Sequence, residues 1–273
     1  MGFKAATRYL RLYGAFIRNC FRQAVEFRAN FIANLLTNLA WMLTLLIFID
    51  ILFRNTQSVA GWSKAEMLVL FGTYTSMRGL SNTLFYANLS QLPTYVRTGT
   101  MDFILAKPVN SQFYVSLRYI GLEDLGQTLG GLFVIGYGWA ILPNHPVFAV
   151  GVAAAFVALL ACSLVLFYSM TLLMMTLSFW LVRLDNLMIL GDMIFSIART
   201  PIDIFRRMGP GVFYLLTYIL PLAFIAALPV KVLFRQIGAA SVLAESALLA
   251  TAFLAAAIWF WRYATRAYAS ASS

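Results

Sequence analysis

The run VFAVGVAAAFVALLACSLVLFYSMTLLMMTLSFWLV, residues 147–182, holds 36 consecutive positions without a charged side chain. A helix needs about 20 mostly apolar residues to cross the roughly 30 Å of hydrocarbon in a bilayer. The run contains no turn signal, and it is too short for two crossings joined by a connection. It therefore predicts one long, tilted membrane-spanning helix.

The composition of the whole chain agrees with this reading. Hydrophobic residues make up 62% of the 273 positions and charged residues only 11%, which lies outside the range of soluble domains. The net charge of +10 comes from basic residues that flank apolar runs and form no single patch with interleaved aromatic residues. We interpret these basic residues as the ones that orient the protein in the membrane, and we expect no nucleic-acid partner.

The pattern of apolar runs predicts an all-α, polytopic transmembrane bundle of six helices in residues 25–273. Both termini are then expected on the cytoplasmic side, and residues 143–146, which include His145, are expected to form a tight external turn. The predicted spans are residues 29–53, 66–91, 112–142, 147–182, 184–200 and 239–261.

Residues 1–24 carry basic side chains three, four or seven positions apart, with apolar and aromatic residues between them. This spacing predicts a basic amphipathic helix that lies in the membrane interface. A cleaved signal peptide would need an unbroken apolar core of about 7 to 15 residues. The arginines interrupt any such core, so we expect the segment to remain on the cytoplasmic side. The basic residues are Lys4, Arg8, Arg11, Arg18 and Arg22.

Residues 201–237 contain four of the eight prolines in the chain: Pro201, Pro210, Pro221 and Pro229. Prolines at this density break helices, and broken backbone at membrane depth is tolerated only beside protein or a water-filled cavity. The segment is therefore predicted to form short re-entrant helices on the outer side, before the last span. In an alternative topology, residues 184–207 lie on the cytoplasmic surface and residues 211–230 make the fifth crossing.

No motif for bond-making chemistry is found. The chain lacks a Gly-Lys dipeptide and hence the phosphate-binding loop GxxxxGK[ST]. The single histidine, His145, has no metal-type partner nearby, and Cys20 and Cys162 stand far apart. We therefore expect no catalytic residue, no metal site and no cofactor in this chain.

The connection at residues 92–110 has the features of an ordered loop. Gly99 is expected to end one short helix in a left-handed conformation, Thr100 to cap the next, and Asp102 to lie in its first turn. Pro108 is expected to stop that second helix. Its apolar residues, Met101, Phe103, Ile104 and Leu105, are expected to form a face outside the bilayer that binds a partner.

The run GTMDFILAKP, residues 99–108, resembles the Gly-x-Leu-Asp-x-x-Leu-x-Arg-Pro signature of one branch of the bacterial type-2 ABC exporter permeases. Met101 stands in place of the signature's Leu, and Lys107 in place of its Arg. The proline-containing run YILPLAFIAALP, residues 218–229, is similar to the re-entrant segment of this family before its last span. The resemblance extends over essentially the whole chain.

The resemblance implies a permease subunit of the inner (cytoplasmic) membrane that exports a substrate by alternating access. Two copies of a separate ABC ATPase would bind ATP and Mg²⁺, and a second permease, identical or related, would complete the transporter. The loop would carry the coupling helix that docks on the ATPase. In the simpler interpretation, the loop is an ordered connection without a partner. The coupling role would fall on Arg97, Gly99, Thr100, Met101, Asp102, Phe103, Ile104, Leu105, Lys107 and Pro108.

Polar residues within the predicted spans are candidates for a translocation path, because a charge near the bilayer centre costs about 2.5 to 3.5 kcal/mol and should face protein or water. They could equally hold the bundle together by hydrogen bonds between helices. The candidates are Asn34, Asn38, Thr75, Arg78 and Asn82. The sequence leaves four acidic partners open for Arg78, namely Glu123, Asp124, Asp192 and Glu245.

Two other classes of function stay open at this point. In an ion-coupled secondary carrier, buried acids such as Asp192 and Glu245 would bind the coupling ion, although no inverted repeat is visible. A membrane-embedded enzyme would need convergent catalytic side chains, and the only adjacent acids are Glu123 and Asp124.

Overall fold

The computed structural model describes residues 2–26, 28–142, 150–181 and 187–268. Within these ranges the chain is helical with no β-strand, which confirms the predicted all-α class. The predicted turn at residues 143–146 lies outside the described residues. Three described segments are long and apolar enough to span a membrane: Phe31–Arg54, Val150–Phe179 and Ala239–Ala267.

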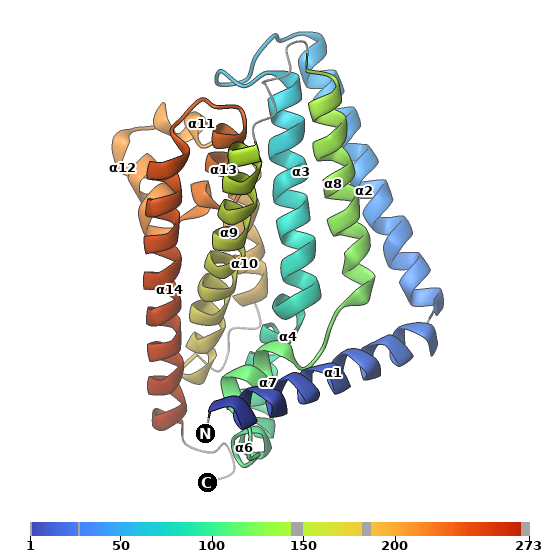
Figure 1. Cartoon of the computed structure of the whole chain (residues 1–273), viewed down its shortest axis with the longest axis vertical. Helices are drawn as coiled ribbons and strands as arrows, with labels where there is room; N and C mark the ends of the chain where they lie inside the picture. The colour runs from blue at the N-terminus through green and yellow to red at the C-terminus, as the bar shows by residue number, and fades with distance from the viewer. Residues whose placement is uncertain (1, 27, 143–149, 182–186, 269–273) are drawn as a thin grey trace.

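From residue 28 onward, the longer described helices, together with α10, lie roughly along the long axis of the bundle, and each runs opposite to the one before it (Figure 1). A short helix, α10, is the exception in length: its 11 residues rise by about 16 Å, roughly half the thickness of the hydrocarbon layer. These helices are α2 (Arg28–Arg54), α3 (Lys64–Ser81), α8 (Leu125–Ala140), α9 (Val150–Thr176), α10 (Leu187–Ile197) and α14 (Ala239–Ala267).

The two ends of the bundle carry different elements (Figure 1). One, called here the terminal end, holds the last turn of α14 together with α1 (Gly2–Glu26), α5 (Leu92–Arg97), α6 (Thr100–Leu105) and α7 (Ser111–Leu117). The opposite end holds the α2–α3 connection together with α11 (Asp203–Arg206), α12 (Pro210–Tyr214) and α13 (Ala227–Leu233). Both α1 and the end of α14 therefore lie at the same end of the bundle.

The proline-rich segment stays at the opposite end. From α12 the chain continues through a π-helical turn, Leu215–Ile219, and a 3₁₀ turn, Leu222–Phe224, into α13. Asp203 of α11 accepts a hydrogen bond of 2.9 Å from Trp62 Nε1 in the α2–α3 connection. This contact fixes α11 far from the terminal end, which argues against the alternative topology, in which residues 184–207 lie on the cytoplasmic surface with both termini.

The predicted third span, residues 112–142, is wrong as a continuous helix. Helix α7 ends at Leu117, and α8 begins only at Leu125 after a 3₁₀ turn. Tertiary hydrogen bonds replace the helical ones at this break. The Asn88 side chain accepts from Tyr119 N at 2.8 Å and donates to Tyr119 O at 2.6 Å, and Gly121 N donates to Thr83 O at 3.0 Å.

Helices α3 and α8 approach each other closely through glycines. A Cβ atom added at Gly131 would lie 2.5 Å from Ser76 N, and one added at Gly72 would lie 2.7 Å from Gly131 O. Gly79 and Gly138 meet equally close neighbours across the same interface. Gly126 and Gly130 of α8 face α2 instead, where added Cβ atoms would meet only the flexible side chains of Leu35 and Met42.

We expect Gly131→Ala to destabilise the protein by about 1 to 3 kcal/mol, because backbone atoms leave no room for the methyl group. Gly136, on the same helix, has open space around it, and Gly136→Ala is the matched control. It should be neutral or slightly stabilising, since alanine favours helix. Thermal unfolding in detergent measures both variants. Equal midpoints for the two would contradict the close α3–α8 contact.

Asp203 ties three segments together at the opposite end. Besides the Trp62 bond it accepts one from Lys231 Nζ at 2.8 Å, and both side chains of this pair are largely buried. Burial alone would raise the pKa of the Asp203 carboxyl, but the bonds from Lys231 and Trp62 and the charges of Lys231 and Arg206 outweigh it, so its pKa lies below 3.8. The ionised form is therefore the one that stabilises the fold.

We expect Asp203→Asn to lower stability at pH 7 by about 3 kcal/mol, because it leaves the Lys231 ammonium largely buried without its counter-charge. A lowered pKa contributes stability that is full above the unfolded pKa and is lost as the pH falls through the folded pKa. The gap between wild type and variant should therefore begin to narrow as the pH falls below 3.8, the ordinary pKa of the carboxyl. Unfolding midpoints from pH 7 to pH 3 measure this. If the difference in unfolding midpoint between wild type and variant stayed constant over this pH range, the loss of stability would come from packing and not from the Asp203 charge.

Candidate functional site

The loop at the terminal end is ordered by its own backbone. Gly99 adopts φ +71°, the left-handed conformation predicted for it, and its carbonyl accepts a hydrogen bond from Asp102 N at 3.1 Å. The prediction that Thr100 caps α6 is wrong: Thr100 is the first helical residue, and its hydroxyl contacts the Thr98 hydroxyl at 2.8 Å. Asp102 lies in the first turn, as expected.

The four apolar side chains of α6 do not form one exposed face. Met101 and Ile104 are 0% and 3% exposed and belong to the main hydrophobic core, and Leu105 packs against it. Phe103 alone points outward, with 75% of its surface exposed. The predicted apolar face is therefore wrong in extent, because α6 folds back against α5 and α7 and buries its other apolar residues. A single aromatic side chain remains to meet a partner.

The loop exposes basic and polar residues as well as Phe103. The exposed residues of the loop include two of the basic residues singled out from the sequence, Arg97 and Lys107. Lys107 lies over the Tyr114 ring at 5.0 Å. Within the segment 94–108, the exposed residues are Thr94, Arg97, Thr98, Phe103, Ala106, Lys107 and Pro108.

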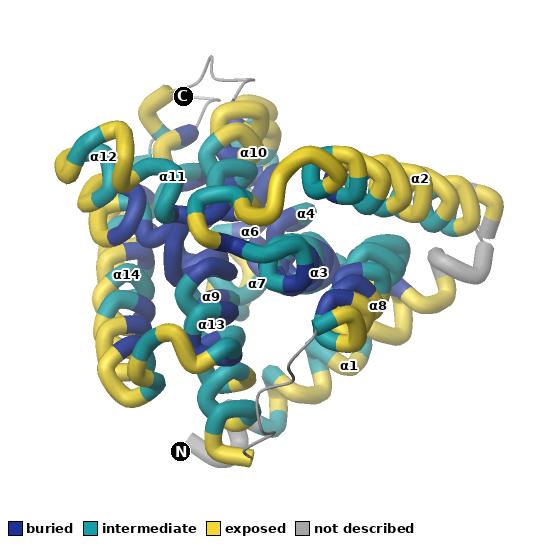
Figure 2. The backbone as a smooth tube through the Cα atoms, turned by 90° about the horizontal axis from the view of Figure 1, so that it is seen from above, coloured by how far each residue is buried: buried dark blue, intermediate teal, exposed yellow. Residues whose placement is uncertain are grey.

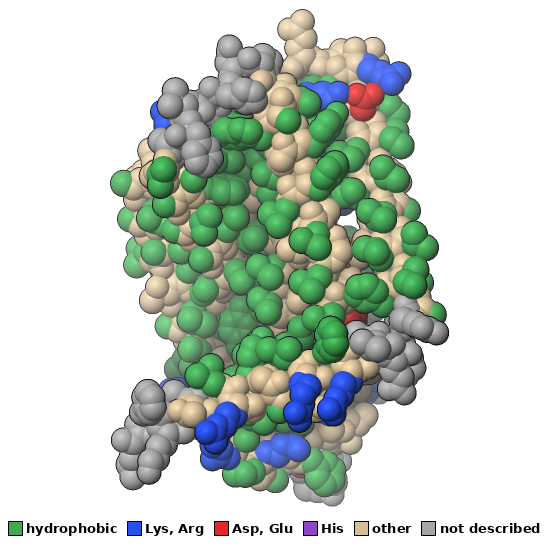
Figure 3. Space-filling view, turned by 45° about the vertical axis from the view of Figure 1, so that its right-hand side comes forward, with side chains coloured by type: hydrophobic (Ala, Val, Ile, Leu, Met, Phe, Trp, Pro, Cys, Tyr) green, Lys and Arg blue, Asp and Glu red, His purple; other side chains and the backbone are tan. Residues whose placement is uncertain are grey.

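Helix α1 braces this loop from outside the bundle, where it lies across the terminal end (Figure 1). Arg8 donates a hydrogen bond of 2.7 Å to Pro108 O, and the Tyr9 hydroxyl accepts one of 3.1 Å from Asn110 N. The Tyr9 and Phe113 rings meet edge to face at 4.9 Å. Other arginines of α1 face outward (Figure 3). Sequence periodicity predicted the helix but gave no sign of these contacts.

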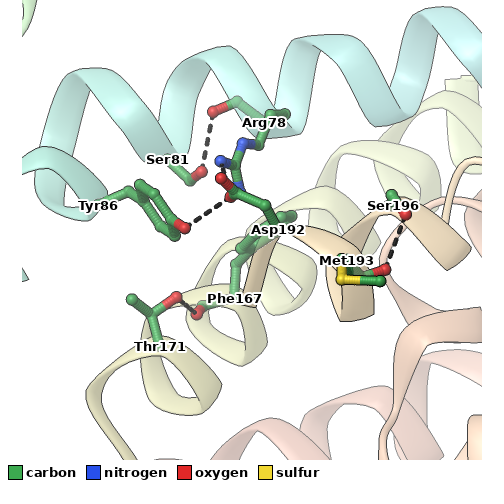
Figure 4. Close-up of polar contacts among 8 residues, drawn as sticks. All are labelled: Arg78, Ser81, Tyr86, Phe167, Thr171, Asp192, Met193 and Ser196. Atoms are coloured by element: carbon green, nitrogen blue, oxygen red, sulfur yellow. Dashed lines mark hydrogen bonds and ion pairs between the residues drawn. The ribbon is translucent and has the colours of Figure 1, made fainter. Parts of the chain in front are cut away.

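About halfway between the two ends of the bundle, Arg78 of α3 forms an ion pair with Asp192 of α10 (Figure 4). The Tyr86 hydroxyl donates to the same carboxylate oxygen at 2.6 Å, and the Arg78 guanidinium lies 4.1 Å from the centre of the Tyr86 ring. Arg78 is 13% exposed and Asp192 50%. Of the four acids that the sequence left open, Asp192 is thus the partner, while Glu123 accepts from the Tyr119 hydroxyl at 2.7 Å.

A π-helical turn, Asn82–Tyr86, makes this arrangement possible. In a regular α-helix, two residues eight apart lie about 80° apart around the axis. The π turn accommodates one extra residue and thereby brings Arg78 and Tyr86 to the same face. Within the turn, Thr83 O accepts a hydrogen bond of 3.0 Å from Gly121 N in the break before α8. The predicted second span is therefore helical through this region but not regular.

A cavity of about 670 Å³ opens between α2, α3, α8 and α10. Three of the five predicted path residues line it, namely Asn38, Thr75 and Arg78; Asn34 and Asn82 do not. Asp192 and Arg199 also line it, together with the apolar and aromatic residues Trp41, Met42, Phe48, Phe71, Tyr74 and Val134. Figure 3 shows a gap in the side-chain surface beside α2. Arg199 was not among the path residues predicted from the sequence.

Helix α2 closes this cavity only loosely. It makes few contacts with the rest of the bundle, and its exposed residues include Trp41 and Phe48 of the cavity wall (Figure 2). Among the described residues, no three or more His, Cys, Asp or Glu side chains lie together as they would in a metal site. The polar groups that face the cavity are thus the Arg78–Asp192 pair, Arg199 and a few uncharged side chains.

Comparison with known proteins identifies the family. The sequence matches the family model of the ABC-2 family transporter proteins over residues 39–272, from the middle of α2 to beyond the end of α14. No curated protein and no solved structure matches the chain. Since the match covers far more than half of the chain, including the loop and the cavity, the protein belongs to the ABC-2 transporter family and is a membrane permease component of an ABC transporter.

Proposed function

We propose that the chain is the membrane-spanning subunit of an ATP-driven exporter whose ATPase is a separate polypeptide. The observation that carries the proposal is the loop at the terminal end, which presents one exposed phenylalanine on a rigid base. Phe103 is 75% exposed, while its neighbours Met101 and Ile104 are buried in the core. An aromatic anchor on a rigid element is the usual centre of a protein interface.

The base of the loop also connects it to the cavity. Met101 and Ile104 belong to the same hydrophobic cluster as Tyr86, whose hydroxyl holds Asp192, and Phe195 of α10. A displacement of α6 by the ATPase would therefore act on α3 and α10 through packed side chains. Alternating access would result if this displacement changed which end of the bundle opens to the cavity.

The charge distribution supports a cytoplasmic position for the terminal end. The basic residues of α1 gather there (Figure 3), and positive charge near short loops favours the cytoplasmic side. The ATPase, acting in the cytoplasm, would then meet the loop from that side. The transporter would sit in the inner membrane with two ATPase copies, which bind ATP and Mg²⁺, and a second permease, identical or related.

Affinity purification of the tagged protein from native membranes in mild detergent tests the proposal. We expect a polypeptide with a GxxxxGK[ST] motif to copurify, because the chain lacks this motif and needs an ATPase partner. If no such polypeptide appears under gentle conditions, the exporter proposal fails. Reconstituted vesicles with an imposed ion gradient would then test the ion-coupled carrier.

A further inference from the structure

We propose that the cavity between α2, α3, α8 and α10 binds an amphipathic anion, a molecule with an apolar chain and a single acidic headgroup, and that this class is the transported substrate. The inference rests on the proposed function and names its substrate class. Arg78 and Arg199 would bind the headgroup, and the aromatic wall of α2 would bind the chain.

The charges of the cavity favour an anion. Two arginines and one aspartate line it. The Asp192 carboxylate is already shared between Arg78 and the Tyr86 hydroxyl. Arg78 Nη1, by contrast, is buried and has no hydrogen-bond partner among the described residues. A buried charged donor without an acceptor is costly, and an acidic headgroup would supply the acceptor.

Arg199 offers the acidic headgroup a second binding position. Arg199 lies just beyond α10, seven residues after Asp192, which corresponds to about 10 Å of helical rise. Tyr74 of α3 lines the cavity together with both arginines. The backbone of Arg199 therefore lies at a different height along the bundle from Asp192, which holds Arg78, and both arginines line the cavity.

The outer wall of the cavity is mostly apolar. On α2 it is formed by Leu39, Trp41, Met42, Leu45 and Phe48, together with the uncharged polar residues Asn38 and Thr44. Trp41 and Phe48 are exposed on the loosely packed helix. Charged groups on the inner wall and apolar groups on the outer wall suit a ligand whose headgroup points inward and whose chain reaches toward the bilayer.

Equilibrium binding of radiolabelled dodecyl phosphate to the protein in phosphatidylcholine nanodiscs, with empty nanodiscs as background, tests the site. We expect saturable binding to wild type, and an apparent affinity at least about tenfold lower for Arg199→Gln, the loss of one charge-assisted contact. Arg199 is outside the ion pair, so this variant should fold. Arg78→Gln should weaken binding similarly. Arg262→Gln, an exposed arginine of α14 away from the cavity, is the matched control.

Dodecyltrimethylammonium and dodecanol are the comparison probes. Equal saturable binding of either one, or dodecyl phosphate binding that Arg199→Gln leaves unchanged, would overturn the proposal. With the ATPase present, ATP should release the bound probe; a probe that stays bound would be a resident lipid and would overturn the substrate assignment. If the probe bound in an arginine-dependent way but no ATPase copurified, the binding site would stand and the exporter proposal would fail. If an ATPase copurified but the probe did not bind in an arginine-dependent way, only the substrate class would be rejected.

Discussion

Replacing Phe103 by aspartate is expected to weaken the binding of the ATPase subunit at least about 30-fold. Phe103 is the one large apolar side chain of α6 that is exposed. Removal of an aromatic anchor at the centre of an interface typically costs 2 kcal/mol or more, and 1.4 kcal/mol corresponds to a factor of ten. The carboxylate would also have to be desolvated in the interface. The yield of copurified ATPase and its affinity for the purified permease measure the effect.

Phe103→Leu is the matched control, because it keeps an apolar side chain at the same position. We expect it to retain most of the ATPase binding and Phe103→Asp to fold normally, since the side chain makes little contact with the rest of the chain. If Phe103→Asp retained the ATPase in full, the loop would be an ordered connection without a partner, and the coupling role would have to lie elsewhere at the terminal end.

The second large effect is expected at the Arg78–Asp192 pair. Asp192→Leu leaves the guanidinium of Arg78, which is only 13% exposed, without its counter-charge. Breaking a buried pair costs about 3 to 5 kcal/mol, and because Asp192 is half exposed we expect the lower end of this range. The thermal unfolding midpoint in detergent should fall by several degrees.

The double variant Arg78→Leu with Asp192→Leu should recover most of this loss, because replacing both partners by apolar residues is often neutral. Such a rescue would show that the pair is not needed for the fold and is therefore free to serve binding. A double variant as unstable as the single one would show that the pair, with Tyr86, holds α3 and α10 together. The double-mutant cycle separates these two roles.

Sequence patterns predicted the elements of this fold better than their contacts. Composition and apolar run length gave the all-α class and the long helices α2, α9 and α14, because burial in lipid depends on the number of apolar residues in a row. The break before α8 was not predictable in this way. It depends on Asn88, more than 30 residues away, whose side chain replaces helical hydrogen bonds at Tyr119.

In the candidate site, too, local features could be predicted from the sequence, whereas tertiary contacts could not. The left-handed Gly99 could be predicted, because only local backbone sterics decide it. The burial of Met101 and Ile104 could not, since four apolar residues on a short helix look the same whether a partner protein or the core of the same chain covers them. Likewise, Arg78 was recognisable as a buried charge, but the choice of Asp192 over three other acids needed the tertiary structure.

The π turn at Asn82–Tyr86 also has a consequence for chain length. Deleting one residue within it would restore a regular α-helix, and the chain that follows would be rotated by about 100° and drawn in by about 1.5 Å relative to the start of α3. Gly99 and Phe103 would then leave the terminal end in another direction. We therefore expect that family members whose sequences are one residue shorter here compensate with an inserted residue before the loop.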